Sequence, residues 1–159
     1  MKQILILNLK ILAAHLVACG LGILSIIIIA GSANIYIPYI AFSITIPAIY
    51  ILAGFWGNNG RLKGKKPIIS MFWLSIVLSA LMLYFVLSGV NIKNMTPLQV
   101  FAIFANIPFF RLFFFDHNSW VILILAFSAP LWPSSLALLG FWLRSVWRKR
   151  KTKDNETID

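Results

Sequence analysis

The sequence contains very few acidic side chains. Three of its four Asp and Glu residues lie in the last six positions, and the fourth is Asp116. The pair of carboxylates used in much general acid–base catalysis is therefore missing from the body of the chain. One cysteine excludes an internal disulfide, and we find no cluster of residues with metal-ligand spacing, phosphate loop or nucleophile arrangement. We expect no catalytic residues, no cofactor and no bound metal.

Charge of either sign is also scarce. Only 11% of the residues are charged, against about a quarter in soluble domains, whereas 60% are hydrophobic. The net charge of +10 lies in short blocks beside long apolar runs, where it has a topological cause, so no nucleic-acid partner is expected. We predict an all-α, polytopic integral membrane protein with membrane lipid around it.

Four apolar runs are long enough to cross a bilayer as helices, which takes about 20 residues. They cover residues 11–30, 35–56, 68–90 and 120–142. Residues 1–147 are thus predicted to form one domain of four transmembrane helices, with an interfacial outer segment between the third and the fourth. The tail, residues 148–159, is first basic and then acidic, and we expect it to be disordered.

Basic residues orient these spans, because short loops rich in Lys and Arg stay on the cytoplasmic side. Four spans leave only Lys93 and Arg111 outside. We predict a bacterial inner (cytoplasmic) membrane protein with both termini in the cytoplasm. The residues that carry this topology are Arg61, Lys63, Lys65 and Lys66 in the loop and Arg148, Lys149, Arg150 and Lys151 in the tail.

The outer segment contains a second apolar run, Leu98 to Phe115, which we interpret as interfacial, while a re-entrant segment or a fifth span stays open. Thr96, Pro97 and Gln99 form a capping box with proline at the first helical position, so a helix should begin here. Pro108 should end or kink that helix. The outer-loop interface is predicted to consist of Phe109, Arg111, Phe114 and Asp116.

Small residues recur every four positions on two predicted spans. Ala14, Ala18 and Gly22 share one face of the first span, and Ser75 and Ser79 share a face of the third. Such stripes let membrane helices approach closely. We interpret both as packing within the domain rather than as a dimer interface.

The two histidines invite a haem interpretation, but the predicted topology places His15 toward the cytoplasm and His117 outside. A core or interfacial role is therefore expected for each.

The residues Leu16 to Cys19, followed by Gly20, resemble the lipobox of bacterial lipoproteins, which would imply a lipidated Cys19 as the N-terminus. The chain departs from that family because Lys10 and His15 interrupt the preceding apolar stretch. It also continues after Gly20 with an apolar run where lipoproteins have a polar tether.

The function expected from these observations is non-catalytic: the protein binds or scaffolds another membrane protein, or a second copy of itself, through its helix faces and the Phe-rich loop. In size, charge and number of spans the chain also resembles the immunity proteins that protect bacteria from pore-forming colicins, which makes immunity or exclusion one alternative. The other is a small channel or carrier subunit that uses helices broken by Pro38, Pro47, Pro130 and Pro133. The four predicted spans contain no Asp, Glu, Lys or Arg, which disfavours transport by this chain alone, and no small-molecule substrate can be named.

Overall fold

The computed structural model describes residues 2–32, 36–58, 65–88, 95–110 and 128–156, and nearly all of them are helical. In chain order the elements are α1 (Lys2–Gly31), α2 (Tyr36–Gly57), α3 (Lys65–Met71), α4 (Trp73–Leu87), α5 (Pro97–Phe110), the 3₁₀ turn η3 (Ala129–Leu131) and α7 (Trp132–Glu156). No strand occurs in these ranges, so the all-α prediction is confirmed. Three segments are long and apolar enough to cross a membrane: α1, α2 and Lys66–Tyr84, which joins α3 to α4.

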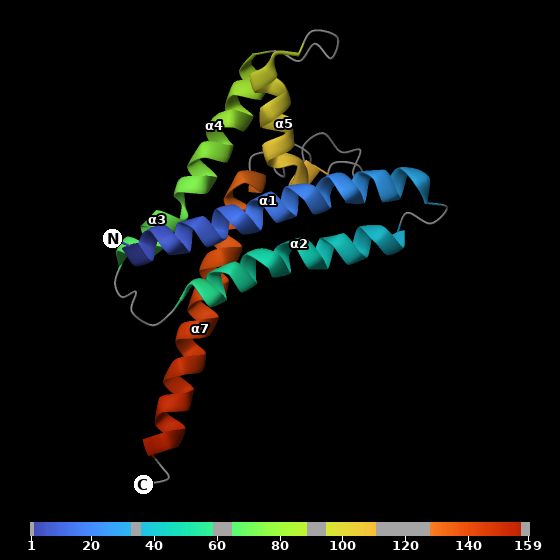
Figure 1. Ribbon diagram of the computed structural model, residues 1–159. Helices are drawn as coiled ribbons and strands as arrows, with labels where there is room; N and C mark the ends of the chain where they lie inside the picture. Colours follow the sequence, from blue (N-terminus) through green and yellow to red (C-terminus); the bar gives the residue numbers. More distant parts are fainter. Residues whose placement is uncertain (1, 33–35, 59–64, 89–94, 111–127, 157–159) are drawn as a thin grey trace.

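The helices are arranged as two antiparallel pairs and one crossing helix. Helices α1 and α2 lie side by side, while α4 and α5 form a second pair that stands steeply on α1 (Figure 1). Helix α7 crosses α2 and extends away from both pairs (Figure 1). The axes of the described helices therefore point in different directions, unlike those of a bundle of four parallel spans.

Helix α1 begins well before residue 11, where the first span was predicted to start. Its N-terminal part carries Leu7, which is fully buried together with Ile11 in a cluster that includes Met71 of α3 and Ala137 of α7. Packing of this face against two other helices stabilises the extra turns, since tertiary contacts supply most of the stability of a helix in a protein.

Helix α5 begins where its sequence predicts. The Gln99 backbone N–H donates to the Thr96 hydroxyl (3.3 Å), and the Thr96 N–H donates to the Gln99 side-chain oxygen (2.8 Å). These two bonds are the reciprocal pair of a capping box. Pro108 lies inside α5, which ends two residues later at Phe110.

The fourth predicted span differs from the structure in its described part. Residues 120–127 lie outside the described residues, and η3 separates them from α7, which has Pro133 in its first turn. Proline is favoured in the first turn of a helix, which agrees with a helix start at Trp132. Helix α7 then continues to Glu156, through most of the tail for which we predicted disorder. Lys and Arg are good helix formers, and Lys151 packs over Trp147 one turn earlier.

Pro47 does not break α2, which runs continuously from Tyr36 to Gly57. The nearby Thr45 hydroxyl donates to the Ala41 carbonyl (2.8 Å), one turn back. Pro38 lies in the first turn of the helix, where no partner for its nitrogen is needed. The expected interruption of the second span is therefore absent from α2 as the structure describes it.

Candidate functional site

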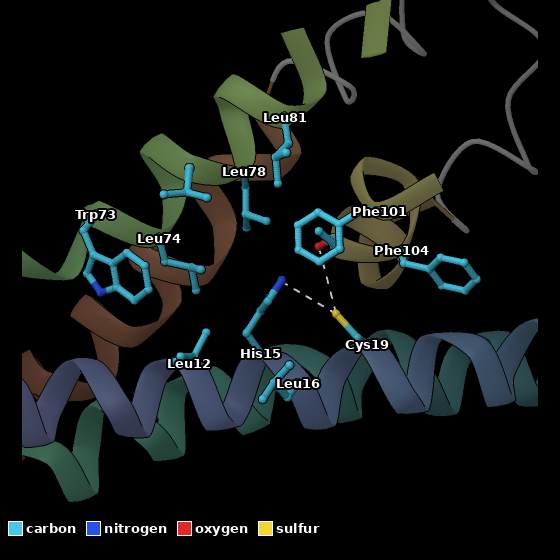
Figure 2. Close-up of a pocket in the computed structure, with 12 residues that line it drawn as sticks. Leu12, His15, Leu16, Cys19, Trp73, Leu74, Leu78, Leu81, Phe101 and Phe104 are labelled. Atoms are coloured by element: carbon cyan, nitrogen blue, oxygen red, sulfur yellow. Dashed lines mark hydrogen bonds between the residues drawn. The ribbon is translucent and has the colours of Figure 1, made fainter. Parts of the chain in front are cut away.

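A cavity of about 260 Å³ lies between α1, α4 and α5. Figure 2 shows His15 and Cys19 pointing from α1 into this space, facing leucines of α4 and Phe101 of α5. The leucines that line the α4 wall are Leu74, Leu78 and Leu81. Phe101 and Phe104 of α5 also line the cavity and are about half exposed. The cavity is thus an apolar recess that opens beside two exposed phenyl rings.

One polar cluster, made of His15, Tyr50 and Cys19, interrupts the apolar wall. Nδ1 of His15 and Oη of Tyr50 share a hydrogen bond of 2.7 Å, which links α1 to α2. On the other side of the ring, Nε2 of His15 lies 3.6 Å from Sγ of Cys19. The Cys19 thiol also donates a weak hydrogen bond to the Ala105 carbonyl of α5 (4.0 Å). His15 is buried, as expected for a core role, and the cluster joins three helices.

The chemistry available to this cluster is limited. It contains no carboxylate to orient His15 as a catalytic base. One imidazole and one thiol are fewer ligands than the three or four side chains of a typical zinc site, and no group of three or more His, Cys, Asp and Glu side chains occurs in the described part of the chain. The arrangement favours hydrogen bonding between helices, which holds membrane helices together.

The small-residue stripe on α1 contacts two different helices. Ala14 and Ala18 are buried against Ile46 and Tyr50 of α2. Gly22 faces α5 instead, where a Cβ atom would lie 2.7 Å from the Ile107 side chain. The stripe therefore mediates packing inside this chain, against α2 through the two alanines and against α5 through the glycine.

The serine stripe contributes one hydrogen-bonded contact. Ser75 donates to the Ser134 hydroxyl of α7 (2.7 Å), and Ser134 donates to the Met71 carbonyl of α3 (2.6 Å). Both serines are buried, whereas Ser79 is partly exposed.

A very close contact between α2 and α7 was not predicted from the sequence. Where α7 crosses α2, a Cβ atom on Gly54 would overlap the carbonyl of Ala137, and one on Gly140 would overlap the carbonyl of Ile51. Only glycine at both positions lets the two backbones touch. Single glycines in apolar runs have no distinctive spacing, so the sequence offered no signal that would pair these two.

Basic and aromatic side chains gather around the C-terminal end of α2. The Arg144 guanidinium of α7 lies over the rings of Phe55 and Trp147, 4.7 and 4.6 Å from their centres. Lys10 of α1 donates to the Trp56 carbonyl (3.1 Å). We call these five residues the basic-aromatic cluster.

Asn58, directly after α2, links that helix to α7. Its amide donates to the Phe141 carbonyl (2.9 Å) and to the Ser145 hydroxyl (2.8 Å). The end of α2 is thereby fixed to α7 at a defined position.

The structure places only some of the predicted topology and loop residues. Lys66, Lys149, Arg150 and Lys151 are exposed and Arg148 is partly exposed, while only the backbone of Lys65 is described. Arg61, Lys63, Arg111, Phe114 and Asp116 lie outside the described residues, and for Phe109 only the helical backbone is described. The outer-loop interface therefore stays a prediction.

Comparison with known proteins found no matching family, no matching curated sequence and no matching solved structure.

Proposed function

We propose that this chain is a non-catalytic protein of a bacterial inner membrane that binds another membrane protein at the cavity between α1, α4 and α5. In this proposal both termini are cytoplasmic and the chain crosses the membrane four times. Helix α5 is re-entrant, because it packs on Gly22, which lies in the middle of the first predicted span.

The observation that carries the proposal is the combination of an apolar recess with exposed rings at its edge. The recess is large enough for an aromatic or branched side chain, and its walls come from three helices. Phe101 and Phe104 extend the same surface outward. A helix laid against a hydrophobic groove inserts its side chains in this way.

The experiment is site-specific photocrosslinking in the native membrane. Phe104, about half exposed at the cavity, is replaced by benzoylphenylalanine, and Ile44, exposed on α2 away from the cavity, is replaced in a matched control. After irradiation and purification in mild detergent, mass spectrometry identifies crosslinked proteins.

We expect one membrane protein crosslinked at position 104 and absent at position 44. A crosslink to a second copy of this chain would show that the partner is another copy of the same protein. Crosslinks to lipid alone at both positions would contradict the proposal and leave immunity and transport to be tested by toxin challenge and by flux in vesicles.

A further inference from the structure

A second groove, of about 340 Å³, runs between α1 and α2. Its lining includes three alanines, Ala13, Ala14 and Ala53, together with Leu52. These short side chains leave a shallow apolar channel along the helix pair. Helices α1 and α2 are antiparallel (Figure 1). Lys10 of α1 and Trp56 of α2 therefore meet at one end of the groove, where the Lys10 ammonium donates to the Trp56 carbonyl.

Lys10 is the one charged residue among the described residues of the lining, and within the described part of the chain it forms no salt bridge. Its ammonium donates one hydrogen bond to the Trp56 carbonyl (3.1 Å), which holds the charge at the groove's end. An ammonium has three donors, so two more hydrogen bonds can be made to a ligand. The sequence has no Asp or Glu before Asp116, so helices α1 to α5 supply no carboxylate. A bound anion can therefore supply the complementary charge.

The position of Lys10 indicates which anion that is. Trp56 is largely exposed beside it, and the rest of the basic-aromatic cluster surrounds the same end of α2. Trp, Lys and Arg gather in this way at the level of lipid headgroups. Basic pockets between membrane helices on the cytoplasmic side bind anionic headgroups.

We propose that the groove between α1 and α2 binds one anionic phospholipid. The Lys10 ammonium contacts the phosphate, and one acyl chain lies over the alanines toward the centre of the helix pair. This site is separate from the cavity at His15, and it does not depend on the proposed protein partner.

The proposal is tested by native mass spectrometry of the full chain taken from nanodiscs that contain equal amounts of phosphatidylglycerol and phosphatidylcholine. Lys10→Gln removes the charge, with Lys66→Gln as the matched exposed lysine outside the groove. Ala13→Phe fills the groove, with Ala30→Phe as the matched exposed alanine of α1 outside it. Circular dichroism checks that each variant is folded.

We expect the parent chain to retain one phosphatidylglycerol in preference to phosphatidylcholine. Lys10→Gln should lower that preference about fivefold, which corresponds to the ~1 kcal/mol that one Lys gains near an anionic surface. Ala13→Phe should lower retention of both lipids, and neither control should change it. Equal losses with Lys10→Gln and Lys66→Gln, or no preference in the parent chain, would overturn the proposal.

Discussion

The α2–α7 crossing and the junction of α1 with α4 and α5 solve helix packing in opposite ways. At the crossing, Gly54 and Gly140 remove every side-chain atom and the backbones touch. At the junction, large leucines and phenylalanines surround a cavity, and the weak hydrogen bond from the Cys19 thiol to the Ala105 carbonyl joins α1 to α5.

The α2–α7 crossing tolerates no added atom, whereas the junction of α1 with α4 and α5 has room for more atoms. The crossing fixes the position of α7, and Asn58 adds two hydrogen bonds there. The junction keeps space for a ligand or a partner side chain. Stability and binding should therefore respond to substitutions in different parts of the molecule.

The largest effect is expected at the crossing. Gly54→Ala places a methyl group on the Ala137 backbone, 2.6 Å from its carbonyl carbon, and must push the helices apart. We expect a loss of about 1–3 kcal/mol in the free energy of unfolding, the range for overpacked interiors. Titration with a denaturing detergent in mixed micelles measures it.

Gly20→Ala is the control for this substitution, because nothing lies within 4 Å of a Cβ atom at that position. It should leave stability unchanged or raise it slightly, since Ala is the better helix former. An equal loss at Gly20, where an added Cβ meets nothing, would show that close approach of the helices does not explain the loss at Gly54.

A smaller effect is expected for the hydrogen bond between His15 of α1 and Tyr50 of α2, which links the junction to the helix that α7 crosses. Tyr50→Phe removes the hydroxyl group that pairs with His15 and leaves the buried Nδ1 without that partner. The cost should be about 1–2 kcal/mol, as for interhelical hydrogen bonds in model membrane peptides. The same titration applies, with Tyr84→Phe as a control at an exposed tyrosine. Identical values for both variants would contradict a structural role of the His15–Tyr50 pair.

The position of α5 at the cavity depends on its capping box. Thr96→Ala removes the acceptor for the Gln99 N–H and should cost about 1 kcal/mol, while Thr96→Ser keeps the hydroxyl and most of the stability. Hydrogen exchange of the first turn of α5 measures the change locally. Unchanged exchange in the Ala variant would mean that packing alone holds this end.

The smallest effect on stability is expected inside the cavity. Leu81→Phe adds volume where space exists and should change the free energy of unfolding by no more than about 0.5 kcal/mol. It should nevertheless abolish the crosslink expected at position 104. Leu83→Phe, exposed on the same helix and outside the cavity, should leave the crosslink intact. A crosslink that survives Leu81→Phe would exclude the cavity as the partner's binding site.

Local patterns predicted much of the fold. The second span, residues 35–56, nearly coincides with α2, because an uninterrupted apolar run of membrane length sets both of its ends. The start of α5 followed from Thr96 and Gln99, whose bonds join residues three apart. The burial of Ala14 and Ala18 followed from a four-residue spacing on one helix.

The remaining features depend on contacts between distant residues. Tyr50 lies 35 residues from His15, and nothing in either local sequence pairs them. The same holds for Gly54 and Gly140. Helix α7 extends beyond its predicted end because the Arg144 and Lys151 side chains pack on Trp147, an interaction that a count of tail charges does not include.

The α2–α7 crossing also bears on how the protein is made. The Asn58 amide donates to the Phe141 carbonyl, 83 residues further along the chain. Synthesis of those residues takes about 4–17 s at roughly 5–20 residues per second. Helices α1 and α2 are adjacent in sequence and can pair during that interval. Until α7 has been synthesised, the face of α2 that carries Gly54 is open to lipid or to membrane chaperones. A ribosome that stalls before Trp132 would therefore leave a nascent chain whose first hairpin is assembled but whose α2–α7 crossing does not yet exist.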